Sequence, residues 1–181
     1  CVPNKSLPSK SSVAVHKLPG GGGFLWAVAT SPDRTQDIRA QTVGCLRALD
    51  RMIDKAAAFA EAKQGKSAVS VEASLINARL APDMFAFARQ VQIATDMAKG
   101  CAARLANVEV PKYEDTETTF AELKARIART VAFIESFSAD QLDGAEARTI
   151  QLKTGGRDVT FTGRDYLFGF VYPNVFFHLT T

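Results

Sequence analysis

The sequence predicts an all-α protein, a four-helix bundle with a small β-hairpin between the third and fourth helices. Three observations lead to this prediction. From residue 35 onward, apolar side chains recur at the three- and four-residue spacing of amphipathic helices. The links between these helical patterns are short. Between residues 150 and 161 the pattern changes to the two-residue alternation of strands.

Residues 1–34 differ in composition from the rest of the 181-residue chain. They contain Ser, Lys, Pro and four consecutive glycines at 20–23, and they show no sustained apolar periodicity. Such a stretch buries too little apolar surface to offset the entropy lost on ordering. The apolar residues 24–29 are too few for a signal peptide, and the glycines separate them from the upstream lysines. We therefore predict a flexible or non-native N-terminal tail over 1–34 and one helical domain over 35–181.

The first helix is predicted to begin after residues 31–33, Ser-Pro-Asp, which supply an N-cap, a first-turn proline and a first-turn acid. Gly65 is predicted to end it, directly after a basic last turn. The residues expected on its buried stripe are Ile38, Thr42, Cys45, Leu46, Leu49, Met52, Ile53, Ala56, Phe59 and Ala60.

A second helical block runs from about residue 72 to residue 107 and contains Pro82. Because proline disrupts a helix interior, we expect either a short helix up to Leu80 and a longer one beginning at Pro82, or a kink at Pro82. The longer helix has an apolar seam with a seven-residue repeat, which is typical of bundles. The seam residues are Met84, Phe87, Val91, Ala94, Ala98, Cys101 and Leu105.

Residues 119–122, Thr-Phe-Ala-Glu, predict a capping box at the start of the third helix. Its stripe is Phe120, Leu123, Ile127, Val131, Ile134 and Phe137. The hairpin is predicted from alternating residues on either side of Gly155-Gly156. Residues 162–165 then cap a fourth helix, which is rich in aromatic residues and interrupted by Pro173.

Charge, hydropathy and cysteine content indicate which classes of partner and which cellular compartment the sequence favours. The net charge of +3 comes from residues 1–34, so the helical domain is neutral and offers no excess charge to a phosphate backbone. No apolar run has the roughly 18–20 residues of a membrane span. Three cysteines without CxxC spacing argue against a disulfide framework or a zinc knuckle and fit a reducing cytoplasm. Cys45 and Cys101 lie in helical apolar patterns and are expected to be buried thiols. We therefore expect a cytoplasmic protein that binds neither nucleic acid nor membrane.

Four polar residues fall on the predicted inner faces of the second and fourth helices, where a bundle builds its site. They are Asp83, Gln90, Asn174 and His178. If the two helices are neighbours, these side chains converge. Each also has a simpler structural interpretation: Asp83 as a first-turn carboxylate on the helix dipole, Asn174 as a repair of the backbone at Pro173, and His178 as a hydrogen-bonded core residue. The acidic residues at 114–117 are interpreted as a solvated helix start.

Metal binding by the usual three histidines is excluded, because the chain has two histidines and His16 lies in the tail. A mixed site of His178 and a carboxylate such as Asp83 stays open for a divalent metal that accepts oxygen ligands, with zinc, nickel, manganese or iron as candidates. His178 is the predicted metal ligand. No motif assigns catalytic residues, since GxSxG is absent and no cysteine is positioned against His178.

Several segments resemble a bacterial domain-of-unknown-function family within the DinB/YfiT-like helical bundles. They are residues 78–85 (ARLAPDMF), 88–96 (ARQVQIATD), 114–119 (EDTETT) and 173–178 (PNVFFH). The resemblance implies a four-helix bundle, often dimeric, over about residues 36–181. Some members of that superfamily hold a divalent metal through three histidines and activate a small thiol. At most His178 matches that triad, and we expect the domain to be C-terminally truncated within its last helix.

Two functions follow from these observations. The favoured one is a non-catalytic, metal-free binding or stress-associated bundle, which forms a homodimer through Phe85 and Ile93 or binds a small-molecule ligand. The alternative is a metal-dependent transferase, acting on a thiol, or hydrolase, with its site in the bundle core. In that case His178 is a ligand or general base, and Asp83 and Gln90 orient metal or substrate.

Overall fold

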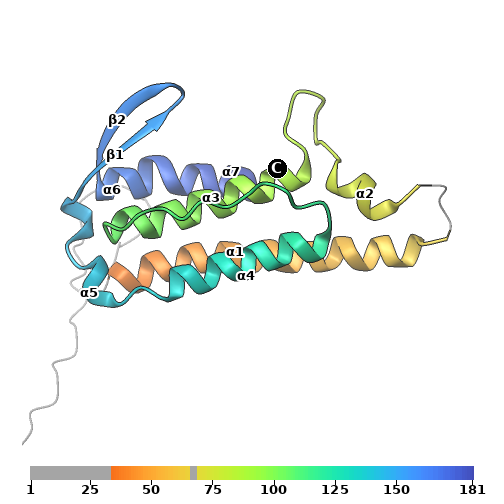
Figure 1. Cartoon of the computed structure of the whole chain (residues 1–181), viewed down its shortest axis with the longest axis horizontal. Helices are drawn as coiled ribbons and strands as arrows, with labels where there is room; N and C mark the ends of the chain where they lie inside the picture. Colours follow the sequence, from red (N-terminus) through yellow and green to blue (C-terminus); the bar gives the residue numbers. More distant parts are fainter. Residues whose placement is uncertain (1–33, 66–68) are drawn as a thin grey trace, which may run out of the picture.

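The computed structural model describes residues 34–65 and 69–181. The predicted tail, apart from Arg34, and the predicted helix cap at residues 31–33 lie outside the described residues. Within them, four long helical segments lie side by side, with α1 and α7 running in one direction and α3 and α4 in the other (Figure 1). These segments are α1 (Arg34–Lys63), α3 (Phe87–Leu105), α4 (Phe120–Glu135) and α7 (Tyr172–Thr180).

Shorter elements connect the long helices. α2 (Val71–Ile76) follows α1, and α5 (Ala139–Leu142) and a 3-10 turn, η1 (Ala145–Ala147), follow α4. The antiparallel strands β1 (Thr149–Thr154) and β2 (Arg157–Thr162) form the hairpin. α6 (Gly163–Asp165) and η2 (Tyr166–Val171) then lead directly into α7. The chain is therefore mostly helical with one small hairpin, as predicted, and no described helix is long and apolar enough to cross a membrane.

Most of the predicted stripe of α1 is buried as far as Ile53. Leu46 and Ile53 are almost fully buried, whereas Met52 is 40% exposed and Phe59 is 52% exposed. The prediction is wrong at Met52, which lies at the edge of the stripe. It is wrong at Phe59 because the end of α1 extends past α4 and α7 (Figure 1), so its last turns have fewer neighbours to cover them. The helix ends where expected, with Gly65 at a φ of +75°, a conformation that glycine adopts without strain.

The prediction of a helix beginning at Pro82 is wrong. α2 ends at Ile76, residues 77–86 form an irregular loop, and α3 begins only at Phe87. The Phe87 amide donates to the Ala78 carbonyl at 2.8 Å and closes this loop, and Pro82 disfavours helical geometry in the residue before it. From Phe87 onward the predicted seam is confirmed, because Val91, Ala98 and Leu105 are buried.

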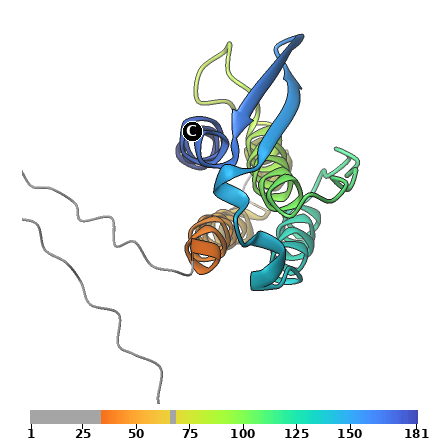
Figure 2. The ribbon, with the colours of Figure 1, turned by 90° about the vertical axis from the view of Figure 1, so that its left-hand side faces the viewer.

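The local signals downstream are confirmed. Thr119 and Glu122 form the capping box of α4. In the hairpin Ile150 pairs with Phe161, and Gly155 and Gly156 have φ of +56° and +78°, which suits the two central positions of a type I′ turn. Figure 2 shows the hairpin projecting beside α7 and α3.

The last helix shows how the chain accommodates Pro173. The segment before α7, η2, is a π-helix, whose wider turn relieves the contact between the proline ring and the preceding carbonyls. Thr162 caps the helix start as predicted, since its hydroxyl accepts from the Asp165 amide. Gly163 lies against the Ala145 backbone so closely that a Cβ would sit 1.8 Å from the Ala145 carbonyl oxygen. Only glycine fits this contact, which joins η1 to the start of the last helix.

Candidate functional site

A hydrogen bond joins α3 and α7 between two of the predicted site residues. His178 Nδ1 lies 2.6 Å from Gln90 Oε1, and both side chains are buried. An amide oxygen only accepts, so Nδ1 carries the proton. Gln90 Nε2 in turn donates to the Phe85 carbonyl at 3.3 Å. One glutamine thereby connects α3, α7 and the loop of residues 77–86.

The surroundings of His178 favour its neutral form. Burial lowers the pKa of His178, and the positive charge of Arg89 lowers it further. A neutral imidazole that donates from Nδ1 keeps an unprotonated Nε2. His178 can therefore accept a hydrogen bond or a proton at Nε2.

The structure places the other two predicted residues differently. Asn174 lies one turn before His178, and its Nδ2 donates to the Phe170 carbonyl at 2.6 Å, the backbone repair that its position beside Pro173 predicts. Asp83 is exposed in a turn of the 77–86 loop. The prediction that Asp83 starts a helix is wrong, because α3 begins four residues later. The observed contact thus joins Gln90 with His178 and leaves Asp83 at the surface.

The described residues do not fit the three-histidine metal site of the superfamily. Across 34–65 and 69–181, no three His, Cys, Asp or Glu side chains are grouped so that they could hold an ion. The Nδ1 of His178 is occupied by Gln90, and the nearby Arg89 charge disfavours a cation. A role for His178 in metal binding therefore stays a prediction.

A charged network on the other side of α3 was not predicted. Arg126 of α4 is 4% exposed. Its Nε donates to Thr95 Oγ1 at 2.7 Å, and its Nη2 lies 2.8 Å from Asp96 Oδ1. Its Nη1 lies 3.0 Å from both Asp115 Oδ1 and Glu117 Oε1. Burial alone would lower the pKa of Arg126, but the Glu117 hydrogen bond and the three negative charges outweigh it and raise the pKa.

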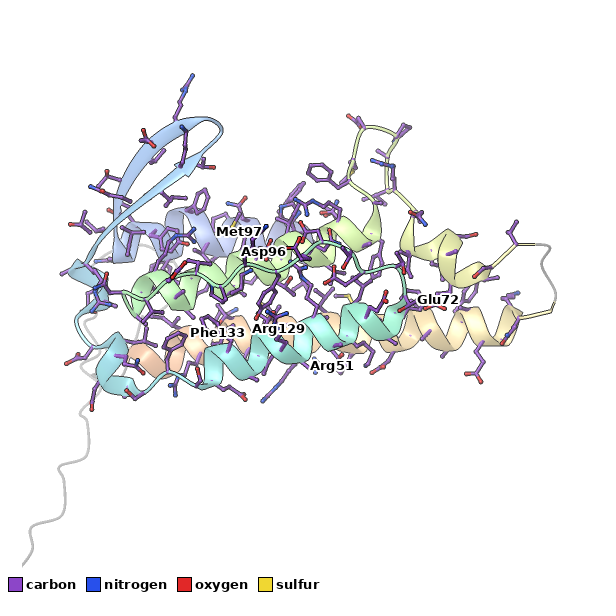
Figure 3. The ribbon with its side chains drawn as sticks, in the orientation of Figure 1. Arg51, Glu72, Asp96, Met97, Arg129 and Phe133 are labelled. Carbon is purple, nitrogen blue, oxygen red and sulfur yellow. The ribbon has the colours of Figure 1, made fainter. Side chains whose placement is uncertain are left out.

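Residues 108–118, here called the strap, lie across α3 and are held by this network. Tyr113 of the strap is nearly buried, with Lys99 Nζ 3.8 Å and Arg129 Cζ 3.7 Å from its ring centroid. Figure 3 shows Asp96 of α3 and Arg129 of α4 on the side where the strap passes. Cations over an aromatic face add to the ion pairs in holding the strap.

The interpretation of residues 114–117 as a solvated helix start is therefore wrong for Glu117, whereas Glu114 and Asp115 are exposed as predicted. The side chain of Glu117 is 13% exposed, because it faces a buried guanidinium. One sequence signal could have indicated this. Arg126 follows Leu123 by three residues and so lies beside the apolar stripe of α4.

Comparison with known proteins identifies the family. The family model of a domain of unknown function, DUF1993, matches residues 37–181. The chain belongs to this family. A crystal structure of a DinB family member from Shewanella denitrificans is 38% identical, with a TM-score of 0.69 over 81% of this chain and 80% of that one. No curated protein matches the chain. The predicted resemblance to a DinB-like domain-of-unknown-function family is confirmed.

Two cysteines of this DUF1993 chain are buried free thiols, as predicted. Burial raises the pKa of Cys101 to about 12, which outweighs the lowering effect of Arg104. Burial also raises the pKa of Cys45. Because the thiolate is the reactive form, both cysteines act as small apolar residues at neutral pH.

A cavity of about 660 Å³ lies between the end of α1, the start of α2 and the start of α4. Its lining includes Phe120, Lys124 and Glu72, which is labelled in Figure 3. The Glu72 carboxylate accepts from the Phe120 amide at 2.7 Å and thereby caps α4. None of the four predicted site residues lines this cavity.

Proposed function

We propose that this protein is a DinB-type four-helix bundle with a metal-free, non-catalytic binding function. Its binding surface is the loop of residues 77–86, and its occupant is a second copy of the chain. The observation that carries the proposal is the exposure of two large apolar side chains on this loop, Leu80 at 73% and Phe85 at 55%. Exposed apolar side chains that lie together are typical of protein-interaction surfaces.

The loop is held in place by its own hydrogen bonds. The Phe87 amide closes it onto the Ala78 carbonyl, and the Met84 amide donates to the Ala81 carbonyl at 3.0 Å. Arg79 donates to the Met84 carbonyl, and Gln90 donates to the Phe85 carbonyl. A backbone ordered before association loses little further entropy, which favours binding.

The Gln90–His178 pair has a positioning role in this proposal. Both ends of the Gln90 amide are engaged, one by His178 and the other by the Phe85 carbonyl. The pair therefore fixes the loop on α3 and α7. Ile93, predicted to accompany Phe85, is partly buried and contributes less surface. The free, buried thiols of Cys45 and Cys101 agree with a location in the cytoplasm.

Light scattering of the full chain tests this function. We expect the native chain to have twice its 19.5 kDa mass, and Phe85→Ser to have the mass of one copy. Phe59→Ser is the matched control, because Phe59 is 52% exposed at the end of α1 and should leave the dimer intact. A monomeric native chain, or a Phe85→Ser variant that stays dimeric, overturns the proposal.

A second candidate function is a metal-dependent transferase or hydrolase, and one observation favours it. His178 donates from Nδ1 to a carbonyl-type oxygen and keeps Nε2 unprotonated, an arrangement that metal-binding histidines commonly share. Elemental analysis after incubation with Zn²⁺, Ni²⁺, Mn²⁺ or Fe²⁺ separates the two functions. Near one equivalent that is lost in His178→Ala supports the enzyme, and no bound metal after any of these incubations counts against it.

A further inference from the structure

Phe177, in the last turn of α7, is an exposed aromatic side chain close to the loop of residues 77–86. Its exposed fraction is 53%, nearly the same as that of Phe85. The Phe177 and His178 ring centroids lie 5.1 Å apart. His178 is bonded to Gln90, whose Nε2 donates to the Phe85 carbonyl. The side chains of His178 and Gln90 therefore connect Phe177 to the loop.

Helical spacing and the hairpin contact of Phe170 place Phe177 on the side of the bundle from which the loop projects. Phe177 follows Phe170 by seven residues, so the two lie on about the same flank of the last helix. Phe170 contacts Phe161 of the hairpin, with ring centroids 5.7 Å apart. Figure 2 shows the hairpin and the loop on the same side, away from α1 and α4, and Figure 1 shows the C-terminal end of α7 beside the loop. Phe177 and the loop therefore face the same side of the molecule.

A stable interface needs more surface than the loop alone provides. Stable protein associations bury about 800 Å² on each partner, contributed by roughly 20–30 residues. Residues 77–86 supply at most about half of that number. The remaining contacts have to come from adjoining elements, and the last turn of α7 offers a large apolar side chain next to the loop.

The charges of the loop favour a second copy as the occupant. Arg79 and Asp83 are both exposed, and no other residue of the loop is charged. The loop therefore has no net charge, and the loops of two copies do not repel each other. In a two-fold interface each copy places the same surface against the other, so the positive side chain of one copy can lie against the negative side chain of the other.

We propose that Phe177 is part of the dimer interface, so that each copy presents the last turn of α7 together with the loop of residues 77–86. This inference rests on the dimer of the proposed function and adds a second element to its surface. Association then removes three large apolar side chains of each copy from water, those of Leu80, Phe85 and Phe177, which favours the dimer.

Photo-crosslinking tests whether position 177 contacts a second copy directly. p-Benzoylphenylalanine replaces Phe177 in the full chain, and irradiation is followed by denaturing gel electrophoresis. We expect a covalent dimer, and none when the probe replaces Phe168, which is 60% exposed near the other end of the last helix. We also expect the cross-link from position 177 to disappear in Phe85→Ser, because one interface contains both residues.

Phe177→Ser provides a second measurement, the dissociation constant of the dimer from light scattering over a dilution series. We expect this constant to rise about tenfold or more, as for a buried aromatic side chain truncated at an interface. Phe168→Ser is the matched control on the same helix and should leave the constant unchanged. Circular dichroism of each variant confirms that the helices are retained before the constants are compared.

The possible results distinguish this inference from the proposed function. If the native chain is dimeric and Phe85→Ser is monomeric, but position 177 gives no cross-link, this inference is overturned and the proposed function stands. A cross-link that persists in Phe85→Ser also overturns it, because the last turn of α7 then contacts a different surface. An unchanged dissociation constant in Phe177→Ser does so as well. A monomeric native chain overturns both.

Discussion

Arg126 and His178 are both buried against α3, but their surroundings differ in kind. Arg126 is charged and has a hydroxyl and three carboxylates around its guanidinium. His178 is neutral and has one amide partner, Gln90. A charge removed from water needs several partners to compensate its lost hydration, whereas a neutral imidazole needs far fewer. We therefore expect the contacts of Arg126 to contribute more to the free energy of unfolding than the Gln90–His178 hydrogen bond does.

The two regions also hold their loops differently. Ion pairs and the two cations near the Tyr113 ring hold the strap across α3. Backbone hydrogen bonds and Gln90 fix residues 77–86, and the apolar side chains of that loop stay exposed. The strap side is therefore closed by its own contacts, whereas the loop side leaves Leu80 and Phe85 exposed, the surface of the proposed dimer.

The largest effect that would test this comparison is expected for Arg126→Met. It leaves Asp96, Asp115 and Glu117 close together without their shared cation, so we expect the free energy of unfolding to fall by about 3–5 kcal/mol. Urea denaturation measures the change. Arg129→Met is the matched control, because Arg129 is exposed and stacks on Tyr113, a contact of about 0.5–1 kcal/mol. If both variants lose the same free energy of unfolding, the burial of Arg126 does not account for its contribution.

A smaller effect is expected for Gln90→Leu. The variant leaves the buried Nδ1–H of His178 and the Phe85 carbonyl without their partner, at a cost of about 1–3 kcal/mol. The double variant Gln90→Leu/His178→Leu should recover part of this loss, because it removes the unpaired imidazole as well. Urea denaturation of both variants tests the expectation. A double variant less stable than Gln90→Leu would show that His178 has a further partner.

The smallest effect is expected in the pH dependence of stability. Burial lowers the pKa of His178 in the folded chain, and the unfolded chain takes up the proton at about pH 6.5. Below that pH the unfolded state binds more protons, so stability falls as the pH decreases through this range. Thermal unfolding of the native chain and of His178→Leu between pH 7.5 and 5 measures the difference. If His178→Leu keeps the same pH dependence of stability as the native chain, that dependence comes from other titratable groups.

Sequence reasoning located Gln90 and His178 because helical spacing alone places each on an inner face. It misplaced Asp83 because the start of α3 is set by the hydrogen bond from Phe87 to Ala78, and not by Pro82. It missed the Arg126 network because three of its partners are 9 to 31 residues away in sequence. The sequence pattern of residues 114–117 gives no indication that a buried guanidinium lies beside them.

The sequence by itself determined the features that depend on near neighbours. The capping box at Thr119, the helix end at Gly65 and the hairpin turn at Gly155-Gly156 each involve residues a few positions apart. The tertiary structure decided which polar residues are buried and what they contact. Burial depends on how helices from distant parts of the chain pack. The same acidic residue is solvated on an open helix start and enclosed when a strap brings it against Arg126.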